Sequence, residues 1–171
     1  MKNNVANLAD LLDRQMALMV DVKYNHGLPR NLSGADAAVA PINHGFKAVQ
    51  IACSAWTAEA LKLTMPASVF SRSTESHNQD KVSMGTIAAR DCLRVLTLAE
   101  QTAAAVLMAS LQSIHLRIQQ GELSADHLSK NLQSFTQLMS KEVTPLANDR
   151  RLDHEIQSLQ PVSYTHLTLP T

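Results

Sequence analysis

The sequence is short of the residues that break helices and of those that build β-sheets. Its 171 residues include five glycines, six prolines, one tryptophan, two tyrosines and three phenylalanines. Few β-branched residues alternate with polar ones, whereas alanine and leucine are abundant and favour helix. The chain is therefore predicted to be all-α. Its length suits one domain with a core of useful size.

Net charge of either sign is absent, and cysteine is scarce. Fifteen Lys and Arg balance fifteen Asp and Glu, which leaves no electrostatic case for a nucleic acid or an anionic membrane as partner. No apolar run has the length expected of a membrane span, and the N-terminus lacks a signal-peptide core. Cys53 and Cys92 fall in apolar helical patterns, which predicts buried free thiols and a cytoplasmic protein. The seven histidines are scattered without metal-ligand spacing, so no metal site is expected.

Apolar residues recur every three or four positions along most of the chain, which is the pattern of amphipathic helices. Helices are predicted over about residues 5–20, 45–64, 80–119, 128–139 and 149–159. The third would be a rod on the order of 60 Å. Such a rod is too long for a compact domain of this size, and it is typical of a bundle shared between elements or subunits.

The polar stretch STESHNQDKVSMG, at residues 73–85, interrupts the apolar pattern. Ser76 and Gln79 have the spacing of a capping box that would start the long helix. Glu75, Asn78 and Gln79 would then lie on one side of the chain. A carboxylate beside two amides can accept from an ammonium group and donate to a carboxylate, and a buried Glu75 could also transfer a proton. The residues alone leave a helix cap and a binding site equally open.

The same stretch resembles the Glu-x-His-Asn-Gln-Asp-x-x-Ser-Leu/Met-Gly motif of the aromatic amino acid ammonia-lyase and aminomutase family. Three further segments resemble that family in the same order: DRQMALMVDVKYNHGLPRNLS, NHGFKAVQIACSAWTAEALKLTMPAS and NDRRLDHEIQSL. The resemblance implies that residues 1–160 are the C-terminal helical region of the long-helix bundle of the ammonia-lyase (fumarase/aspartase-like) fold. Residues 161–171 look like a tail that is not native to the family, with an ordinary C-terminus as the alternative.

The resemblance also implies roles for individual residues. Catalytic positions correspond to Glu75 and Gln79, and substrate-binding positions correspond to Asn78, His77, Lys47 and Ile51. For Lys47 the alternative is an exposed lysine in the first turn of a helix.

The family makes its cofactor, 4-methylideneimidazole-5-one (MIO), from an internal Ala-Ser-Gly. The Ser33-Gly34 pair of this chain follows Leu32, so no cofactor-forming residues are expected here, and a fragment that is inactive by itself is implied. The implied activity of the parent is that of a homotetrameric carbon–nitrogen lyase. It would eliminate ammonia from an aromatic amino acid (Phe, Tyr or His) to give an aryl acrylate. The alternatives are an aminomutase of the same family and a non-catalytic helical oligomerisation module.

Overall fold

The structure is a computed structural model that describes the backbone of residues 1–166 and the side chains of residues 1–160. Every regular element in this part of the chain is helical, so the predicted all-α fold is confirmed. The α-helices are α1 (Lys2–Val20), α2 (Lys47–Lys62), α3 (Gly85–Gln119), α4 (Lys130–Met139) and α5 (Asp153–His166). The short 3-10 helices are η1 (Arg30–Leu32), η2 (Ala40–Ile42), η3 (Ala67–Phe70), η4 (Glu75–His77) and η5 (Ala125–His127).

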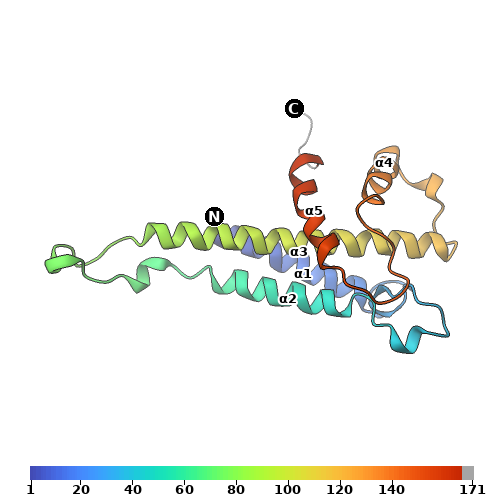
Figure 1. Ribbon diagram of the computed structural model, residues 1–171, viewed down its shortest axis with the longest axis horizontal. Helices are drawn as coiled ribbons and strands as arrows, with labels where there is room; N and C mark the ends of the chain where they lie inside the picture. The colour runs from blue at the N-terminus through green and yellow to red at the C-terminus, as the bar shows by residue number, and fades with distance from the viewer. Residues whose placement is uncertain (167–171) are drawn as a thin grey trace.

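Helices α1, α2 and α3 pack side by side as a three-helix bundle, and α5 packs against α3 (Figure 1). With 35 residues, α3 is about 52 Å long at 1.5 Å per residue. It extends beyond α1 and α2, and its C-terminal part lies beside α4 (Figure 1). The long helix predicted from the sequence is therefore present, and it is the element that the other helices share.

Small residues are buried in the bundle. Ala6 and Ala9 on α1, Ala60 on α2, and Ala105 and Ala109 on α3 are all fully buried. Because only methyl groups stand between the backbones at these positions, the helices can approach closely and gain dispersion contacts. Larger residues here would force the helices apart, at a cost of about 1–3 kcal/mol each.

Gln112, buried in α3, joins two loops to the bundle. Its Nε2 donates to the carbonyl oxygens of Leu32 at 3.1 Å and Leu146 at 3.0 Å, and its Oε1 accepts from the Leu146 N–H at 2.9 Å. The N–H of Gly34 donates to the same Leu146 carbonyl at 3.1 Å. A Cβ on Gly34 would lie 2.5 Å from that oxygen, so the close approach requires glycine.

Residues 63–91 form an arm that projects beyond the N-terminus of α1 (Figure 1). Lys2 spans its base, because its Nζ donates to the Met65 carbonyl at 3.0 Å and to Asp91 Oδ2 at 3.4 Å. The side chains of Lys2 and Asp91 are 14% and 26% exposed, so this ion pair is partly shielded from water and is held more firmly than a surface pair. We call this contact the Lys2 clamp.

The start of α3 differs from the prediction. The helix begins at Gly85 rather than near residue 80, and Met84, with φ of 55°, precedes it without a side-chain cap. The capping box is wrong, because Ser76 lies inside η4 with φ of 49° and the N–H of Gln79 bonds to Thr74 instead. The polar stretch is therefore a loop in front of the helix.

The last helix also differs from the prediction. α5 begins at Asp153 and continues to His166, so it starts later than predicted and extends beyond the predicted end near residue 159. Residues 167–171 of the predicted tail lie outside the described residues.

The two cysteines differ in burial. Cys53 is free and fully buried, and burial, helped by the Asp13 carboxylate, raises the pKa of its thiol to about 12. Cys92 is also free but only half-buried. The prediction of a buried thiol is right for Cys53 and wrong for Cys92, because the side of α3 that carries Cys92 is less covered there.

Among the described residues, α3 is long and apolar enough to cross a membrane by length and composition alone. The sequence reading had found no run of that kind. In the structure α3 contacts α1, α2 and α5, and a helix at the centre of a bundle has the same apolar character.

Candidate active-site residues

The six predicted site residues occupy two separate places. The tip of the arm holds Glu75, His77, Asn78 and Gln79, and the first two turns of α2 hold Lys47 and Ile51 (Figure 1). The arm follows the other end of α2, whose 16 residues span about 24 Å. One copy of the chain therefore does not bring the two groups together.

The tip loop, defined as residues 71–84, is shaped by hydrogen bonds from its backbone N–H groups to a carbonyl and to two side-chain hydroxyl oxygens of the same loop. The N–H of Thr74 donates to the Gln79 carbonyl at 3.0 Å, and the N–H of Gln79 donates to Thr74 Oγ1 at 2.9 Å. The N–H of Val82 donates to Ser71 Oγ at 2.8 Å, which ties the two sides of the arm together. These bonds enclose η4 and fix the direction in which its residues point.

Three residues of the tip loop adopt a backbone conformation that side chains disfavour. Ser76, His77 and Met84 have φ of 49°, 56° and 55°. The left-handed region costs a residue other than glycine about 1–2 kcal/mol. Strain of this kind persists only where the surrounding contacts determine the conformation, and it concentrates at functional sites.

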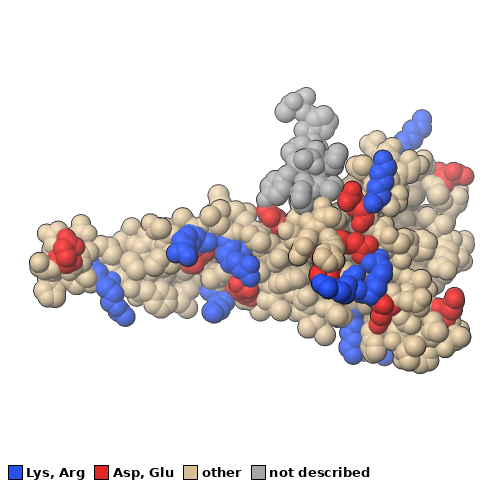
Figure 2. All heavy atoms as spheres, in the orientation of Figure 1, with Lys and Arg blue, Asp and Glu red and all other residues tan. Residues whose placement is uncertain are grey.

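The polar side chains of the tip face solvent. Glu75, Asn78 and Gln79 are exposed, and no side-chain hydrogen bond or ion pair of theirs is found among the described residues. His77 Nδ1 lies 3.1 Å from Ser73 Oγ. In Figure 2 acidic and basic groups are both visible near the tip. The loop thus presents a free carboxylate and two free amides. The burial that proton transfer by Glu75 would require must come from other protein surface.

Lys47 and Ile51 line a hollow of about 720 Å³ between α2 and α5. Trp56, Leu152 and Ile156 form part of its apolar wall. Lys47 is exposed, and Ile51 is 63% exposed. Within this chain Lys47 therefore matches the alternative of an exposed first-turn lysine, placed at the edge of an apolar hollow.

The sequence reading missed Asp149, which organises the start of α2 next to this hollow. Its carboxylate accepts the N–H of His44 at 2.7 Å and that of Gly45 at 2.8 Å. Asn43 Oδ1 accepts the N–H of Asp149 at 2.6 Å. Burial opposes the charged form, but the two N–H donors and the His44 ring outweigh it and lower the pKa of Asp149. Asp149 thereby fixes the turn from which Lys47 begins α2.

The residues nearest to a cofactor-forming triad do not fit that role. Besides following Leu32, Ser33 accepts the Ala35 N–H at 3.4 Å on Oγ, and the Gly34 N–H is bonded to Leu146. Ser33 and Gly34 are therefore part of the packing between loops. No group of three or more His, Cys, Asp or Glu side chains that could hold a metal ion occurs among the described residues.

Comparison with known proteins identifies relatives over nearly the whole chain. A family model described as aromatic amino acid lyase matches residues 1–141. The chain is 36% identical over 163 residues to a tyrosine ammonia-lyase of Cereibacter sphaeroides, which covers 95% of this chain and 29% of that protein. It is 31% identical over 156 residues to a histidine ammonia-lyase of Natranaerobius thermophilus, covering 91% and 29%.

The fold also matches that of solved structures. Tyrosine aminomutase from Streptomyces globisporus superposes with a TM-score of 0.80 at 27% identity, covering 94% of this chain and 29% of that one. A histidine ammonia-lyase from Trypanosoma cruzi superposes with a TM-score of 0.82. The chain thus spans about 30% of the length of the relatives it matches.

Proposed function

The chain belongs to the aromatic amino acid lyase family, and we propose that it forms part of an enzyme that eliminates ammonia from an aromatic amino acid. The substrate would be Phe, Tyr or His, and the product an aryl acrylate. The observation that carries this proposal is the tip loop, where a strained backbone holds Glu75, Asn78 and Gln79 free of partners.

At the tip, the carboxylate of Glu75 can accept hydrogen bonds from the substrate's ammonium group. The amide groups of Asn78 and Gln79 can donate to its carboxylate, and His77 lies beside them. The MIO cofactor that the family uses is not formed by residues of this chain. The part proposed for these residues is therefore to bind and orient the amino acid end of the substrate.

We propose that the complete site draws on more than one copy of the chain. Lys47 and Ile51 border an apolar hollow suited to an aromatic ring. Glu75 belongs to η4, in the arm that extends beyond the opposite end of α2 (Figure 1). Both groups can border one substrate only if they come from different copies. The homotetramer implied by the family resemblance meets this requirement.

The outward face of α1 supports such an assembly. Leu8, Leu11 and Leu18 are 49–59% exposed, and with Gln15 they follow one another at steps of three and four. This is the spacing of a coiled-coil seam, in which one polar residue can fix the register. If the α1 helices of two copies pair in an antiparallel orientation, the tip loop of each copy lies toward the start of α2 in the other copy.

Glu75→Gln tests the proposed role at the tip. The chain replaces the matching region of the Cereibacter sphaeroides tyrosine ammonia-lyase, and acrylate formation from Phe, Tyr and His is followed. We expect kcat to fall by about 10²–10⁴ if the carboxylate acts at the reacting centre. Glu142→Gln, at an exposed site outside the arm, should leave kcat unchanged. A near wild-type rate for Glu75→Gln would favour a non-catalytic oligomerisation module.

Mixing the Lys47→Ala and Glu75→Gln variants tests the shared site, with Lys47→Ala also expected to lower activity. Each proposed site takes Lys47 from one chain and Glu75 from another. When equal amounts of the two variants assemble at random, about a quarter of the sites receive both residues unchanged and regain activity. Activity that does not rise above that of either variant would show that both residues serve the site from one chain.

The second candidate function is an aminomutase, which returns the ammonia to the β-carbon. It is favoured by the structural match to the Streptomyces tyrosine aminomutase. Chromatographic detection of a β-amino acid in the same chimera would support it, and acrylate as the sole product would support the lyase. Neither function uses a metal, a nucleic acid or a membrane in this proposal. The free thiols of Cys53 and Cys92 support a cytoplasmic location.

A further inference from the structure

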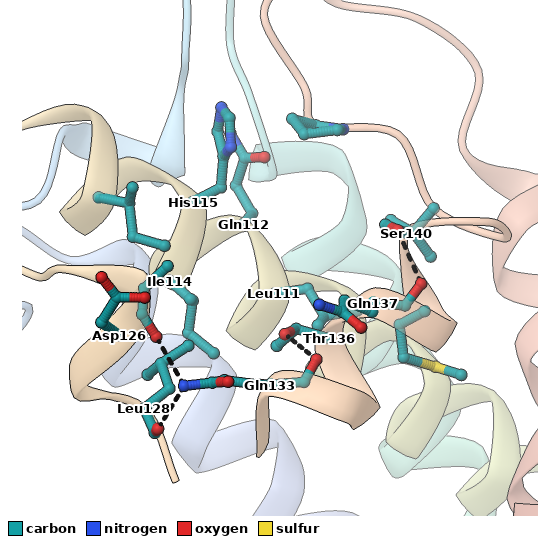
Figure 3. A pocket seen from close by; sticks show the side chains of 15 residues that line it. Leu111, Gln112, Ile114, His115, Asp126, Leu128, Gln133, Thr136, Gln137 and Ser140 are labelled. Atoms are coloured by element: carbon teal, nitrogen blue, oxygen red, sulfur yellow. Dashed lines mark hydrogen bonds between the residues drawn. The ribbon is translucent and has the colours of Figure 1, made fainter. Parts of the chain in front are cut away.

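A cavity of about 330 Å³ lies between α3, η5 and α4 (Figure 3). It is close to His115, 30 residues along α3 from Gly85 and so about 45 Å from the start of that helix. Its apolar lining includes Leu111, Ile114, Ile118, Leu128, Met139 and Val143. The volume suits a small organic molecule. The cavity lies far from the tip loop and shares no lining residue with the hollow beside Lys47 and Ile51.

Hydrogen bonds fix the outer wall of the cavity. Gln133 Nε2 donates to the carbonyl oxygens of Ala125 at 3.2 Å and Leu128 at 2.8 Å, which braces η5 against α4. Ser129 Oγ accepts the Leu132 N–H at 3.3 Å and caps α4. Because this wall is held by its own bonds, the cavity exists before any ligand binds, which lowers the entropic cost of binding.

The polar side chains at the cavity that have no hydrogen-bond partner among the described residues favour a ligand that donates hydrogen bonds. Asp126, His115 and Gln137 line it, and none of their side chains has a partner among the described residues. In Figure 3 the Gln137 amide lies next to Leu111, and Asp126 lies above Leu128. No lysine or arginine lines the cavity, so the one carboxylate at its edge attracts cations and repels anions.

We propose that this cavity binds a primary amine with an apolar body. The ammonium group pairs with the Asp126 carboxylate at the edge, and the apolar body packs against Ile114, Leu128 and Met139. The Gln137 amide supplies a further acceptor. A carboxylate of the same size fits the apolar walls equally well but meets Asp126, so charge rather than shape selects the ligand.

The binding test uses the whole 171-residue chain and three probes: 2-phenylethylamine, 3-phenylpropanoate and ethylamine. In calorimetric titration we expect saturable binding of 2-phenylethylamine alone. Asp126→Asn should weaken it about 5-fold, since an exposed ion pair contributes up to about 1 kcal/mol. Asp36→Asn, at an exposed position outside the cavity, is the matched control and should change nothing. Equal binding of the propanoate, or no binding of the amine, would overturn the proposal.

A second measurement locates the probe without relying on a variant. In methyl NMR spectra, 2-phenylethylamine should shift the resonances of Ile114 and Ile118, which line the cavity. It should leave those of Ile87, in the first turn of α3, unchanged. Ile118→Trp should block binding, because Ile118 is 38% exposed and can carry a larger side chain across the opening. Shifts confined to other methyl groups, or full binding to Ile118→Trp, would contradict the location.

Discussion

Replacing Gln112 with methionine removes three buried hydrogen bonds while nearly preserving the length and volume of the side chain. The Leu146 carbonyl keeps its bond from the Gly34 N–H at 3.1 Å. The Leu32 carbonyl and the Leu146 N–H lose their partners, and both residues are buried. The change therefore leaves two buried backbone groups unsatisfied in one place.

Each unsatisfied buried group costs about 1–3 kcal/mol. The apolar methionine end recovers part of this by burial, about 1 kcal/mol for a group of its size. We expect the free energy of unfolding to fall by about 3 kcal/mol, a large share of the stability of a domain of this kind. The hydrogen bonds that are lost all lie where η1 and the segment around Leu146 contact α3.

The assay is urea unfolding of the purified chain, followed by helical circular dichroism. Gln119→Met, on the same helix but exposed, is the control and should change the free energy of unfolding by less than about 0.5 kcal/mol. Hydrogen exchange adds a local readout, because the amides of Gly34 and Leu146 should exchange faster in Gln112→Met. A variant as stable as the control would refute the claim that these bonds hold the two loops.

Iodoacetamide near pH 8 should label the half-buried Cys92 and spare the fully buried Cys53, because burial and Asp13 raise the pKa of Cys53 to about 12. Peptide mass spectrometry distinguishes the two, and equal labelling would contradict the burial of Cys53. Asp149→Asn should lower Tm at neutral pH. Because the folded-state pKa of Asp149 is depressed, its contribution is present above the unfolded value of about 3.9. The difference from wild type should shrink as pH falls through the folded-state pKa, and a difference that persists in acid would contradict it. Gly45→Ala places a Cβ 2.5 Å from the Asn31 carbonyl at φ of 56° and should cost more than about 1 kcal/mol. Thermal unfolding measures this, and an unchanged Tm would show that the contact relaxes freely.

The helices could be predicted because each buries one face, which places apolar residues at every third or fourth position of the sequence. Leu98 and Met108 are buried in α3, and the apolar repeat around them marks the helix without any tertiary information. The start of α3 could not be found this way. It depends on the bonds between Thr74 and Gln79 and on left-handed conformations at Ser76 and Met84, which neither residue type favours.

The motif resemblance selects Glu75 and Gln79 as candidate site residues, because their types and order are local in the sequence, and their role stays a prediction. The geometry of the candidate site could not be predicted in the same way. The separation of Lys47 from them depends on the direction of the arm beyond α2. Asp149 was missed since its bonds to the N–H groups of His44 and Gly45 join positions more than a hundred residues apart, and no local pattern reports such a contact.

The Lys2 clamp is a fixed point about which the arm can tilt. From Asp91, where the clamp holds α3, to Gly85 is six residues, or about 9 Å of helix. A tilt of roughly 5° about the clamp moves Gly85 by about 0.8 Å, more than the roughly 0.5 Å tolerated in a productive site. Because the tip loop lies farther from the pivot, its displacement is larger still. The contacts of Lys2 on α1 therefore limit how far the tip loop can move from its position.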